Sequence, residues 1–232
     1  GSQTVVGSSA NAFSYELNGN TNIDNYEISK QEGTLTVTNR EAKYEITVKA
    51  NSATATYDGK EHEAVGVETY EFTVEGNSYT VSGLSTEDPK QKDAGSYTNN
   101  ITGTPVVTDK EGNVVTSEFE VKTENGSLEI GKAAVTLKSA TLSKKYDGNA
   151  LVNGDTALEI ESGFAEGEGA TYNFTGSQTV VGSSANAFSY ELNSNTNIDN
   201  YEISKQEGTL TVTNREAKYE ITVKANSATA TY

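Results

Sequence analysis

The chain is poor in the residue types that most often carry chemistry. It contains no cysteine, no methionine and no tryptophan, and it has one histidine and two prolines. The lack of cysteine excludes a thiolate nucleophile and a cysteine-based zinc site. It does not decide the compartment, because secreted and intracellular domains can both do without disulfides. No apolar run approaches the roughly 20 residues that a membrane-spanning helix needs, so we expect no membrane insertion of this segment.

Positive charge is also scarce. The chain has 17 Lys and Arg residues against 33 Asp and Glu residues, which gives a formal net charge of −16. Nucleic acids and anionic membrane surfaces bind through cationic footprints, which such a polyanion lacks. We therefore expect no nucleic-acid partner. What the chain has in abundance is Thr, Ser, Asn, Gly and Tyr, a composition typical of strands and turns.

A long internal repeat is the main feature of the sequence. Residues 176–232 repeat residues 1–57 with one change, Ser194 in place of Gly19, at an offset of 175 residues. Tandem arrays contain such copies, because duplication copies whole units and changes in unit number are tolerated. The chain also does not begin with methionine. We therefore expect it to be one period plus an overlap from a longer repetitive protein, with a role in setting length.

Strict alternation of apolar and polar residues predicts half-buried β-strands. The alternating runs are 34–38, 43–49, 69–75, 119–121 and 128–130. Such strands are typical of antiparallel sheets with one packed face. We expect an all-β fold of tandem small β-sandwich or β-grasp-like modules. No helix of ordinary length is expected, although residues 85–94 have room for one helical turn.

Turn motifs separate the predicted strands. Asp-Gly, Glu-Gly or Asn-Gly pairs occur at residues 58–59, 75–76, 111–112, 125–126 and 147–148. These pairs favour tight turns with positive φ angles. Asn125-Gly126 lies between two alternating runs and gives the strongest prediction of a β-hairpin.

A weaker repeat inside the 175-residue period indicates two module types. Tyr-Asp-Gly occurs at 57–59 and again at 146–148, 89 residues later, and the segment 124–130 resembles 206–212. Each full module has a normal size for a small β unit. We expect the C-terminal half of an A-type repeat at 1–41, a B-type module at 42–131, an A-type module at 132–216 and the start of a further B-type repeat at 217–232.

The predicted junctions between modules are short. Residues 38–43 separate two predicted strands at one junction, and residues 131–134 do so at the next. Neither segment has the composition of a flexible Gly/Ser linker or of a Pro-rich spacer. Because short joints restrict bending, we expect the modules to be joined end to end into an elongated rod.

Several segments resemble the MBG family of repeats. They are KKYDGNAL at 144–151, GFAEGEGATYNFTGSQTVVGSSANAFSYEL at 163–192, NYEIS at 200–204 and EGTLTV at 207–212, with TYDGKEHEAV at 56–65 as a related variant. The A-type module fits throughout, whereas the B-type module departs from the pattern around 85–107. MBG repeats occur in long adhesins on bacterial surfaces, many of them anchored to Gram-positive cell walls. The resemblance implies an extracellular, all-β repeat in the stalk of a large surface protein, without implying a ligand.

The candidate chemical groups have plainer structural interpretations. His62 lies in the charged segment 60–63 without the partners that a catalytic triad or a metal site requires. The glycine-rich segment 163–169 lacks the lysine and the following helix of a phosphate loop, and its glutamates would repel phosphate. Three acidic clusters match no calcium-binding loop, so we expect solvated faces, with weak calcium binding as the alternative. These clusters are Glu161, Glu166 and Glu168; Asp109, Glu111 and Asn113; and Glu87, Asp88 and Asp93.

Tyr57 and Tyr146 recur at the same place in the two module types. Such tyrosines can stack on sugars, but we favour a structural role in which each packs at a strand end with its hydroxyl bonded to backbone. The following Asp and Gly then make the turn. A Lys–Asn or Lys–Asp isopeptide cross-link is a further alternative, and it requires a buried lysine beside a buried acid. We assign no catalytic, cofactor-binding or metal-ligating residue and expect no cofactor.

Two classes of function fit these observations. The first is a structural stalk or fibre segment of a repetitive bacterial surface adhesin, without enzymatic activity, that sets the reach and stiffness of a distal binding domain. Its location would be extracellular, on a cell-wall-anchored surface protein, and its partners neighbouring repeats or other copies head to tail. The second is a repeat that binds host glycans or matrix weakly and gains avidity from multiplicity. An enzyme needs a walled pocket, for which such small modules offer little room.

The half repeat 1–41 raises a separate question. Leu17, Ile28, Leu35 and Val37 have no front-half strands to pack on, and an isolated half-sandwich is not stable. The chain is then a slice of a longer ordered polymer, or neighbouring chains complete each other by strand exchange, or 1–41 folds with the B-type module. We favour the first explanation, and the contacts of Leu35 and Val37 test the third.

Overall fold

The computed structural model describes residues 1–154, 158–160 and 163–232. In this part of the chain the regular structure is β-strand, which confirms the all-β expectation. The exceptions are three single-turn 3-10 helices, η1 (Ile23–Asn25), η2 (Thr116–Glu118) and η3 (Ile198–Asn200). None of the described helices is long and apolar enough to cross a membrane.

The strands form two compact units. Unit 1 comprises Gly1–Ala55 and Glu61–Ile130, and unit 2 comprises Thr56–Lys60 and Gly131–Tyr232. The short segment Thr56–Lys60 therefore belongs to unit 2, although the chain on both sides of it belongs to unit 1.

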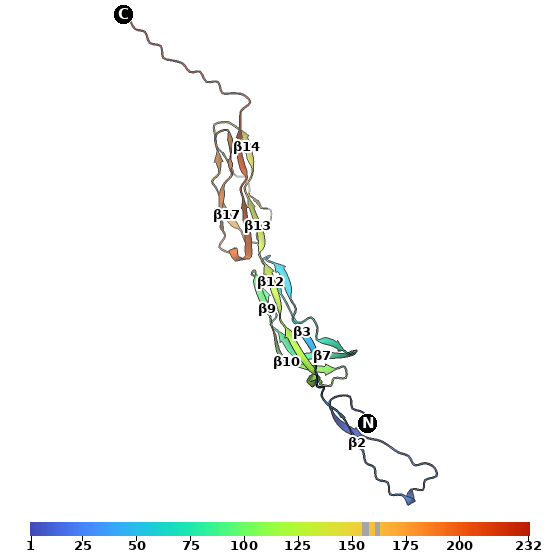
Figure 1. Ribbon diagram of the computed structural model, residues 1–232. Coiled ribbons are helices and arrows are strands. Elements are labelled where there is room, and N and C mark those ends of the chain that lie inside the picture. Colours follow the sequence, from blue (N-terminus) through green and yellow to red (C-terminus); the bar gives the residue numbers. More distant parts are fainter. Residues whose placement is uncertain (155–157, 161–162) are drawn as a thin grey trace. The chain divides into compact units, whose positions relative to one another are not determined.

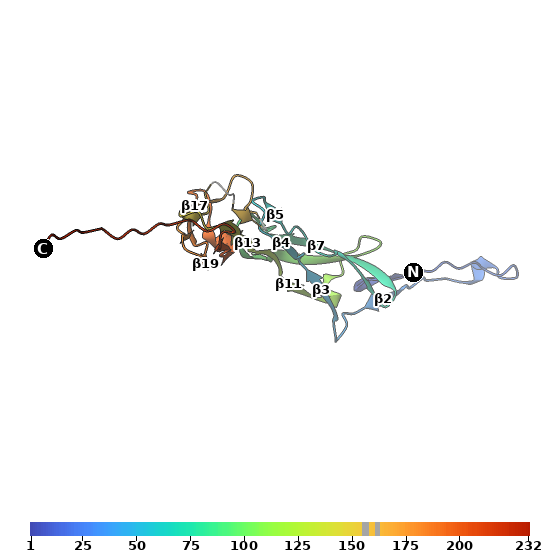
Figure 2. The ribbon, with the colours of Figure 1, turned by 90° about the horizontal axis from the view of Figure 1, so that it is seen from above.

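Unit 1 is built from small sheets of two or three strands. Their orders are β1-β2, β10-β7-β6, β11-β3, β4-β12-β9 and β5-β8, and Figure 2 shows β3 next to β11. The strands are β1 (Gly7–Asn11), β2 (Gly33–Val37), β3 (Tyr44–Lys49), β4 (Ala53–Thr56), β5 (His62–Glu63), β6 (Glu71–Val74), β7 (Asn77–Thr86), β8 (Lys90–Gln91), β9 (Gly95–Asn99), β10 (Ile101–Asp109), β11 (Phe119–Glu124) and β12 (Gly126–Gly131).

Unit 2 has the same kind of construction, and its strands run alongside one another in Figure 1. Their orders are β16-β13-β21, β14-β22-β19, β15-β18 and β17-β20. The strands are β13 (Ala133–Lys138), β14 (Leu142–Lys145), β15 (Leu151–Val152), β16 (Glu159–Ile160), β17 (Ala170–Phe174), β18 (Ser177–Gln178), β19 (Gly182–Ala185), β20 (Phe188–Leu192), β21 (Tyr201–Gln206) and β22 (Thr209–Thr213).

The two units share a strand plan. In each, an early strand pairs with a late one, β3 with β11 and β13 with β21. The next strand, β4 or β14, joins a three-stranded sheet whose central strand is the last of the unit, in the orders β4-β12-β9 and β14-β22-β19. The strand after it forms a two-stranded pair, β5-β8 in unit 1 and β15-β18 in unit 2. The weaker sequence repeat therefore has a counterpart in strand order, while the module boundaries stay a prediction.

The expectation of antiparallel sheets is correct only in part. The pairs β3–β11, β13–β21 and β14–β22 are parallel. Parallel neighbours need a long crossover connection, which here is supplied by the intervening strands of each unit. Alternation could not reveal this, because a strand with one buried face has a period of two in either direction.

The hairpin prediction at Asn125-Gly126 was wrong. β11 ends just before this pair and β12 begins at Gly126, but β11 pairs with β3 whereas β12 pairs with β4 and β9. The chain changes sheets here, and Asn125 Oδ1 accepts a hydrogen bond from the Ile101 backbone N–H at 3.0 Å. A Cβ on Gly126 would collide with the Asn51 carbonyl oxygen. This glycine therefore permits the close approach of two strands rather than a turn.

A hairpin does join β6 to β7. It turns through Glu75 and Gly76, whose φ angles are 50° and 82°. The helical turn considered for residues 85–94 is not present, since β7 extends to Thr86 and β8 occupies Lys90–Gln91. Between them Asp88 has a φ of 52°, and its Oδ1 accepts a hydrogen bond from the Gly66 backbone N–H at 2.8 Å. Polar residues of this kind stabilise turns by bonding backbone groups.

Each unit has its own small core. In unit 1 the buried cluster consists of Ile46, Val48, Val81, Val107 and Phe119. In unit 2 the most buried apolar side chains include Val135, Leu137, Phe188, Leu210 and Val212. Ile46, Val48 and Phe119 lie at apolar positions of the predicted runs 43–49 and 119–121, so the period-two pattern correctly identified these buried faces.

A buried asparagine supports the central sheet of each unit. Asn99 is the last residue of β9 and donates from Nδ2 to the Asn51 carbonyl at 3.1 Å. Asn186 directly follows β19 and donates to the Ala140 carbonyl at 2.9 Å. Both are fully buried, and the donated hydrogen bonds offset part of the cost of burying each amide, although Asn186 Oδ1 has no hydrogen-bond partner among the described residues. The two units therefore repeat this contact as well as the strand order.

The repeated sequence adopts different structures in its two copies. Residues 26–31 form no strand, whereas the same sequence at 201–206 forms β21, paired with β13. Tyr26 is 62% exposed and its counterpart Tyr201 3%; Phe13 is 48% exposed and its counterpart Phe188 3%. The first copy has no partner in the described chain that corresponds to β13 or β17. Its apolar side chains therefore have no surface to pack on.

The other end of the repeat behaves in the same way. In unit 1, Ile46 and Val48 of β3 are 6% and 0% exposed. Their counterparts Ile221 and Val223 are 82% and 90% exposed, and residues 217–232 form no strand (Figure 1). β3 has β11 as its neighbour, whereas the C-terminal copy has no such neighbour. The partner strand, and not the local sequence, decides whether these segments become strands.

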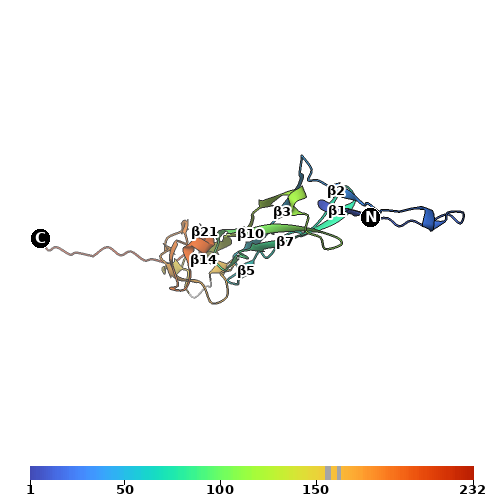
Figure 3. The same cartoon turned by 90° about the horizontal axis from the view of Figure 1, so that it is seen from below.

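Leu35 and Val37 take an intermediate position. They lie on β2, which pairs with β1 (Figure 3), opposite Ser9 and Gly7. Both are half-buried, and neither enters the core cluster of unit 1. Val37 lines a cavity together with Tyr44 and Phe119, and unit 1 includes residues 1–41, so these contacts do not exclude folding of 1–41 with the B-type module.

We predict that one substitution has unequal effects in the two copies. Leu210→Ala removes a fully buried side chain and should lower the free energy of unfolding of unit 2 by about 2–5 kcal/mol. Leu35→Ala, in the same local sequence, removes a half-buried side chain and should cost less than about 1 kcal/mol. Denaturant titration followed by amide NMR signals of each unit measures both. Equal losses would contradict the dependence on partner strands.

Candidate functional site

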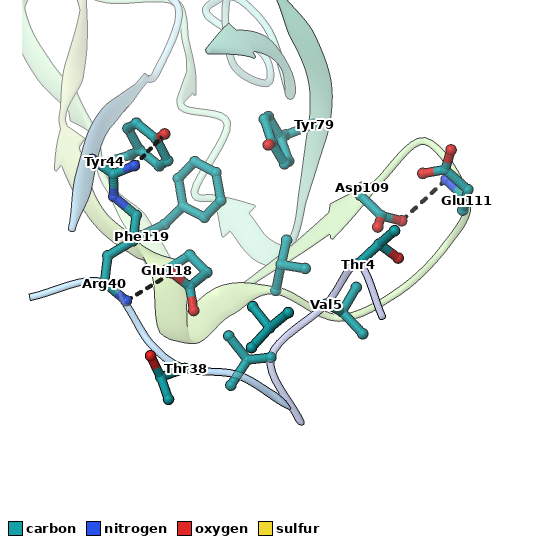
Figure 4. A pocket seen from close by; sticks show the side chains of 13 residues that line it. Thr4, Val5, Thr38, Arg40, Tyr44, Tyr79, Asp109, Glu111, Glu118 and Phe119 are labelled. Carbon is teal, nitrogen blue, oxygen red and sulfur yellow. Dashed lines mark hydrogen bonds between the residues drawn. The ribbon is translucent and has the colours of Figure 1, made fainter. Parts of the chain in front are cut away.

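The largest cavity that we describe lies in unit 1, with a volume of about 500 Å³. The ends of several strands surround it, and Figure 4 shows Tyr44, Tyr79, Phe119, Arg40 and Glu118 beside it. Its lining residues are Thr4, Val5, Val6, Val37, Thr38, Arg40, Tyr44, Tyr79, Asp109, Glu111, Val115, Glu118 and Phe119. A volume of this size is in the range of sites that hold a small molecule or a few side chains.

Aromatic rings form one wall of the cavity. The parallel pairing of β3 and β11 places their first residues, Tyr44 and Phe119, side by side, with ring centroids 5.6 Å apart. Tyr79 on β7 approaches Phe119 edge to face, with centroids 4.8 Å apart. Such geometries stabilise aromatic pairs beyond the area that they bury. The wall is thus a consequence of strand register.

Polar groups at the same end form a chain of hydrogen bonds. Arg40 lies over the ring of Tyr44 and donates to its hydroxyl at 2.5 Å. That hydroxyl donates to Glu75 Oε2 at 2.6 Å, and this hydrogen bond raises the pKa of Tyr44. The hydroxyl of Tyr44 is therefore already occupied by two charged neighbours.

Glu118 is the least satisfied group in the cavity wall. It ends η2, and its Oε2 accepts a hydrogen bond from the Arg40 backbone N–H at 3.2 Å. Its Oε1 is buried and has no hydrogen-bond partner among the described residues. A buried carboxylate oxygen without a donor is costly. Glu118 therefore carries an unpaired acceptor in the wall of the cavity.

A second aromatic cluster lies in unit 2 around Glu168. The hydroxyl of Tyr57 donates to Glu168 Oε1 at 2.5 Å, and the hydroxyl of Tyr201 donates to Oε2 at 2.7 Å. The two rings meet edge to face, with centroids 5.3 Å apart, and Phe164 packs on Tyr201 from another side. The Tyr201 oxygen also accepts a hydrogen bond from the Ala165 backbone N–H at 3.0 Å.

This cluster changes the acidity of its tyrosines. Burial raises the pKa of Tyr201 to about 12, with the hydrogen bond to Glu168 acting in the same direction. Burial and the same carboxylate raise the pKa of Tyr57 well above its usual range. Both hydroxyls therefore stay protonated and remain donors to Glu168 at any physiological pH.

The structure corrects the expected role of Tyr57 in one respect. We expected its hydroxyl to bond backbone, but it bonds the carboxylate of Glu168. Its backbone N–H does donate to the Gly131 carbonyl at 2.8 Å. The turn follows as expected, with Gly59 at a φ of 79° and Asp58 Oδ1 accepting from the Lys60 N–H. The cluster is a packed contact rather than an exposed stacking platform, since Tyr57 is 4% exposed.

Tyr146 repeats the backbone part of this arrangement. Its N–H donates to the Thr213 carbonyl at 2.8 Å, at the end of β22. Gly148 has a φ of 84°, and Asp147 Oδ1 accepts from the Asn149 N–H. Its side chain is half-buried. The same turn is therefore present in both units, but among the described residues a carboxylate accepts from the hydroxyl of Tyr57 and none from that of Tyr146.

The other candidates from the sequence do not converge. His62 lies on β5, opposite Gln91 of β8. Asp109 Oδ1 accepts from the N–H groups of Glu111 and Asn113, which makes a local turn. Glu161 lies outside the described residues. No group of three potential metal ligands is found in the part of the chain that the structure describes.

The remaining candidates also have structural surroundings. Asp88 bonds Thr86 and Gly66, and Glu87 accepts from Asn100. In the segment 163–169, Gly167 has a φ of 80° and its carbonyl accepts from Asn195. The buried polar residues that are described are asparagine, serine and threonine. The buried lysine and acid that an isopeptide requires are not among them.

Sequence reasoning missed both clusters. These are Arg40 with Glu118 in unit 1 and Glu168 with Tyr201 in unit 2. Glu168 was considered only as one of several acidic residues, and Tyr201 only as part of the segment NYEIS. Partners far apart in sequence carry no pairing signal when each residue type is common. The one usable signal was the recurrence of Tyr-Asp-Gly, which correctly pointed to a repeated contact.

Comparisons with known proteins add no relative. Searches against protein-family models, curated proteins and solved structures return no match. The functional argument therefore rests on the sequence repeat and on the geometry of the two units.

We predict that Tyr57 and Tyr201 are among the last tyrosines to titrate. The raised pKa of Tyr201 means that its share of stability is fully present below about pH 10, the unfolded value, and is lost as pH rises toward 12. Tyrosinate absorbance should show a late-titrating fraction, which Glu168→Gln should shift to lower pH and Glu166→Gln should not. Titration of all tyrosines together near pH 10 would contradict the cluster.

Proposed function

We propose that the chain is a structural stalk segment of a repetitive bacterial surface adhesin. In this role the repeats set the reach and stiffness of a distal binding domain, and the number of repeats sets the length. The observation that carries the proposal is the near-identical pair of segments 1–57 and 176–232. Strands at both ends of the repeated segment pair with strands outside the repeat, β3 with β11 and β21 with β13, so the segment is completed by the rest of the period, as in a tandem array.

The connectivity of the two units supports stiffness. The chain passes between them after Ala55, after Lys60 and after Ile130, so they are not joined by a single flexible linker. Only Lys132 separates β12 from β13. Several short connections restrict relative motion more than one long linker does. We propose on this basis that the modules form an elongated rod, built from small β-sandwich or β-grasp-like units.

The surface location follows from the resemblance to MBG repeats and from charge. Those repeats occur in adhesins of bacterial surfaces, and a net charge of −16 favours solubility and discourages self-association. We propose an extracellular position on a wall-anchored protein, with neighbouring repeats as the main partners. We also propose that the segment has no enzymatic activity, because its clustered carboxylates and tyrosines hold turns and contacts.

A weak glycan- or matrix-binding repeat is the second candidate. The tyrosine-lined cavity of unit 1 favours it, since aromatic rings beside polar groups can bind sugars. Amide NMR titration with host glycans tests this candidate. Specific shifts at Tyr44, Tyr79 and Phe119 would support it, and shifts confined to exposed loops would reject it.

The stalk function predicts a fixed length increment per repeat. Chains of one, two and three 175-residue periods should show maximum dimensions in small-angle scattering that grow by a constant step. A stiff series gives linear growth, whereas flexibly linked units give growth nearer the square root of their number. Compact particles, or square-root growth, would remove the rod. A version with a long Gly/Ser insert after Ile130 provides the flexible control.

A further inference from the structure

The cavity of unit 1 occupies the place that Tyr57 fills in unit 2. Tyr57 packs on Tyr201, the first residue of β21. The corresponding residue in unit 1 is Phe119, the first residue of β11, and it lines the cavity. β11 and β21 correspond because each pairs in parallel with the early strand of its unit. In unit 2 this place holds a Tyr-Asp-Gly loop, and in unit 1 it is open.

The strand edge beside the cavity is open as well. In unit 2, β22 lies between β14 and β19. Its identical copy β2 pairs with β1, the counterpart of β19, and no described strand lies on its other side. In unit 2 that other side is taken by β14, whose Leu142 and Lys144 lie opposite Leu210 and Val212. The sequence therefore indicates which strand can pair with the free edge of β2, namely one with the sequence of β14.

The two openings are continuous. β14 leads directly into Tyr146, whose N–H donates to the Thr213 carbonyl at 2.8 Å. The copy of Thr213 beside β2 is Thr38, and Thr38 lines the cavity together with Val37. A strand with the sequence of β14, placed on β2 in the same register, would deliver its tyrosine to the cavity.

The chemistry of the cavity fits such a loop. Glu118 lines the cavity and its Oε1 is buried without a donor; a turn of this side chain toward the cavity would let it accept from a tyrosine hydroxyl, as Glu168 accepts from Tyr57. Asp109, Glu111 and Glu118 line the cavity, whereas Lys144 and Lys145 directly precede Tyr146. In unit 2 Lys145 pairs with Glu216, whose copy beside β2 is Glu41, so docking in the same register brings this pair together.

One difference between the units bears on the fit. Tyr44 pairs with Phe119 where unit 2 has the smaller Ala133 paired with Tyr201. The Tyr44 ring therefore takes part of the space, but its hydroxyl is held by Arg40 and Glu75. The cavity of about 500 Å³ remains beside it.

We propose that this cavity and the free edge of β2 together bind the Leu142–Asn149 segment of an A-type module in a second copy of the chain, with Tyr146 seated against Glu118. The inference rests on the proposed stalk function, since it describes how one repeat is joined to the next. In a series of repeats the occupant comes from the preceding module.

A synthetic peptide with the sequence 139–150 tests the site on the full chain. Titration followed by amide NMR should shift signals of Thr38, Glu118 and Phe119. A peptide with Tyr146→Phe lacks the hydroxyl and should bind about tenfold more weakly, the effect of one hydrogen bond to a charged group. Glu118→Ala should abolish this difference between peptides. Glu120→Ala, which removes an exposed carboxylate two residues further on, in β11, should preserve it.

Three results would overturn the proposal. The first is a set of shifts confined to Thr213 and Tyr201, which would mean that the peptide exchanges with β14 in unit 2. The second is equal affinity of the Tyr and Phe peptides. The third is the lack of any shift at millimolar peptide, which would mean that Tyr44 itself completes the site. A different measurement tests the stalk function. Linear growth of length without peptide binding rejects only this site, whereas compact particles reject the stalk whatever the peptide does.

Discussion

Backbone hydrogen bonding between neighbouring strands is the interaction on which the rest of this structure depends. The repeated segment shows its effect directly, because the same residues are strands where a partner strand is present and irregular where it is not. Tyr26 and Tyr201 differ from 62% to 3% in exposure within one sequence context. Local propensity for strand formation is a weak preference, and packing against neighbours decides the outcome. Each unit of this chain is therefore complete only with strands from distant parts of the sequence.

The same constraint explains how far the sequence could be interpreted. Alternation at 43–49 and 128–130 correctly indicated strands and their buried faces, because period two is a property of any half-buried strand. It could not give partners or direction, so the parallel pairing of β3 with β11 was missed. Asn125-Gly126 was misinterpreted for a related reason. Glycine suits both a turn and a close approach of two strands, and only the collision with Asn51 distinguishes them.

The contacts around the tyrosines were less predictable than the strands. Recurrence of Tyr-Asp-Gly correctly indicated a repeated structural element, and the turns at Gly59 and Gly148 have the expected positive φ angles. The partner of Tyr57 is Glu168, more than a hundred residues away, and nothing local distinguishes this glutamate from its neighbours. The cavity beside Phe119 was also beyond the sequence. It depends on which strand edges are left free, and that follows from topology rather than from composition.

The central claim is that the partner strand, and not the segment's own sequence, orders the repeat. Amide hydrogen exchange measured by NMR on a segmentally labelled chain tests it most directly, because NMR distinguishes residues in identical sequences. Residues 201–206 should exchange slowly, as members of a paired strand, and residues 26–31 should exchange at rates close to those of an unstructured peptide. Similar protection in both segments would contradict the account.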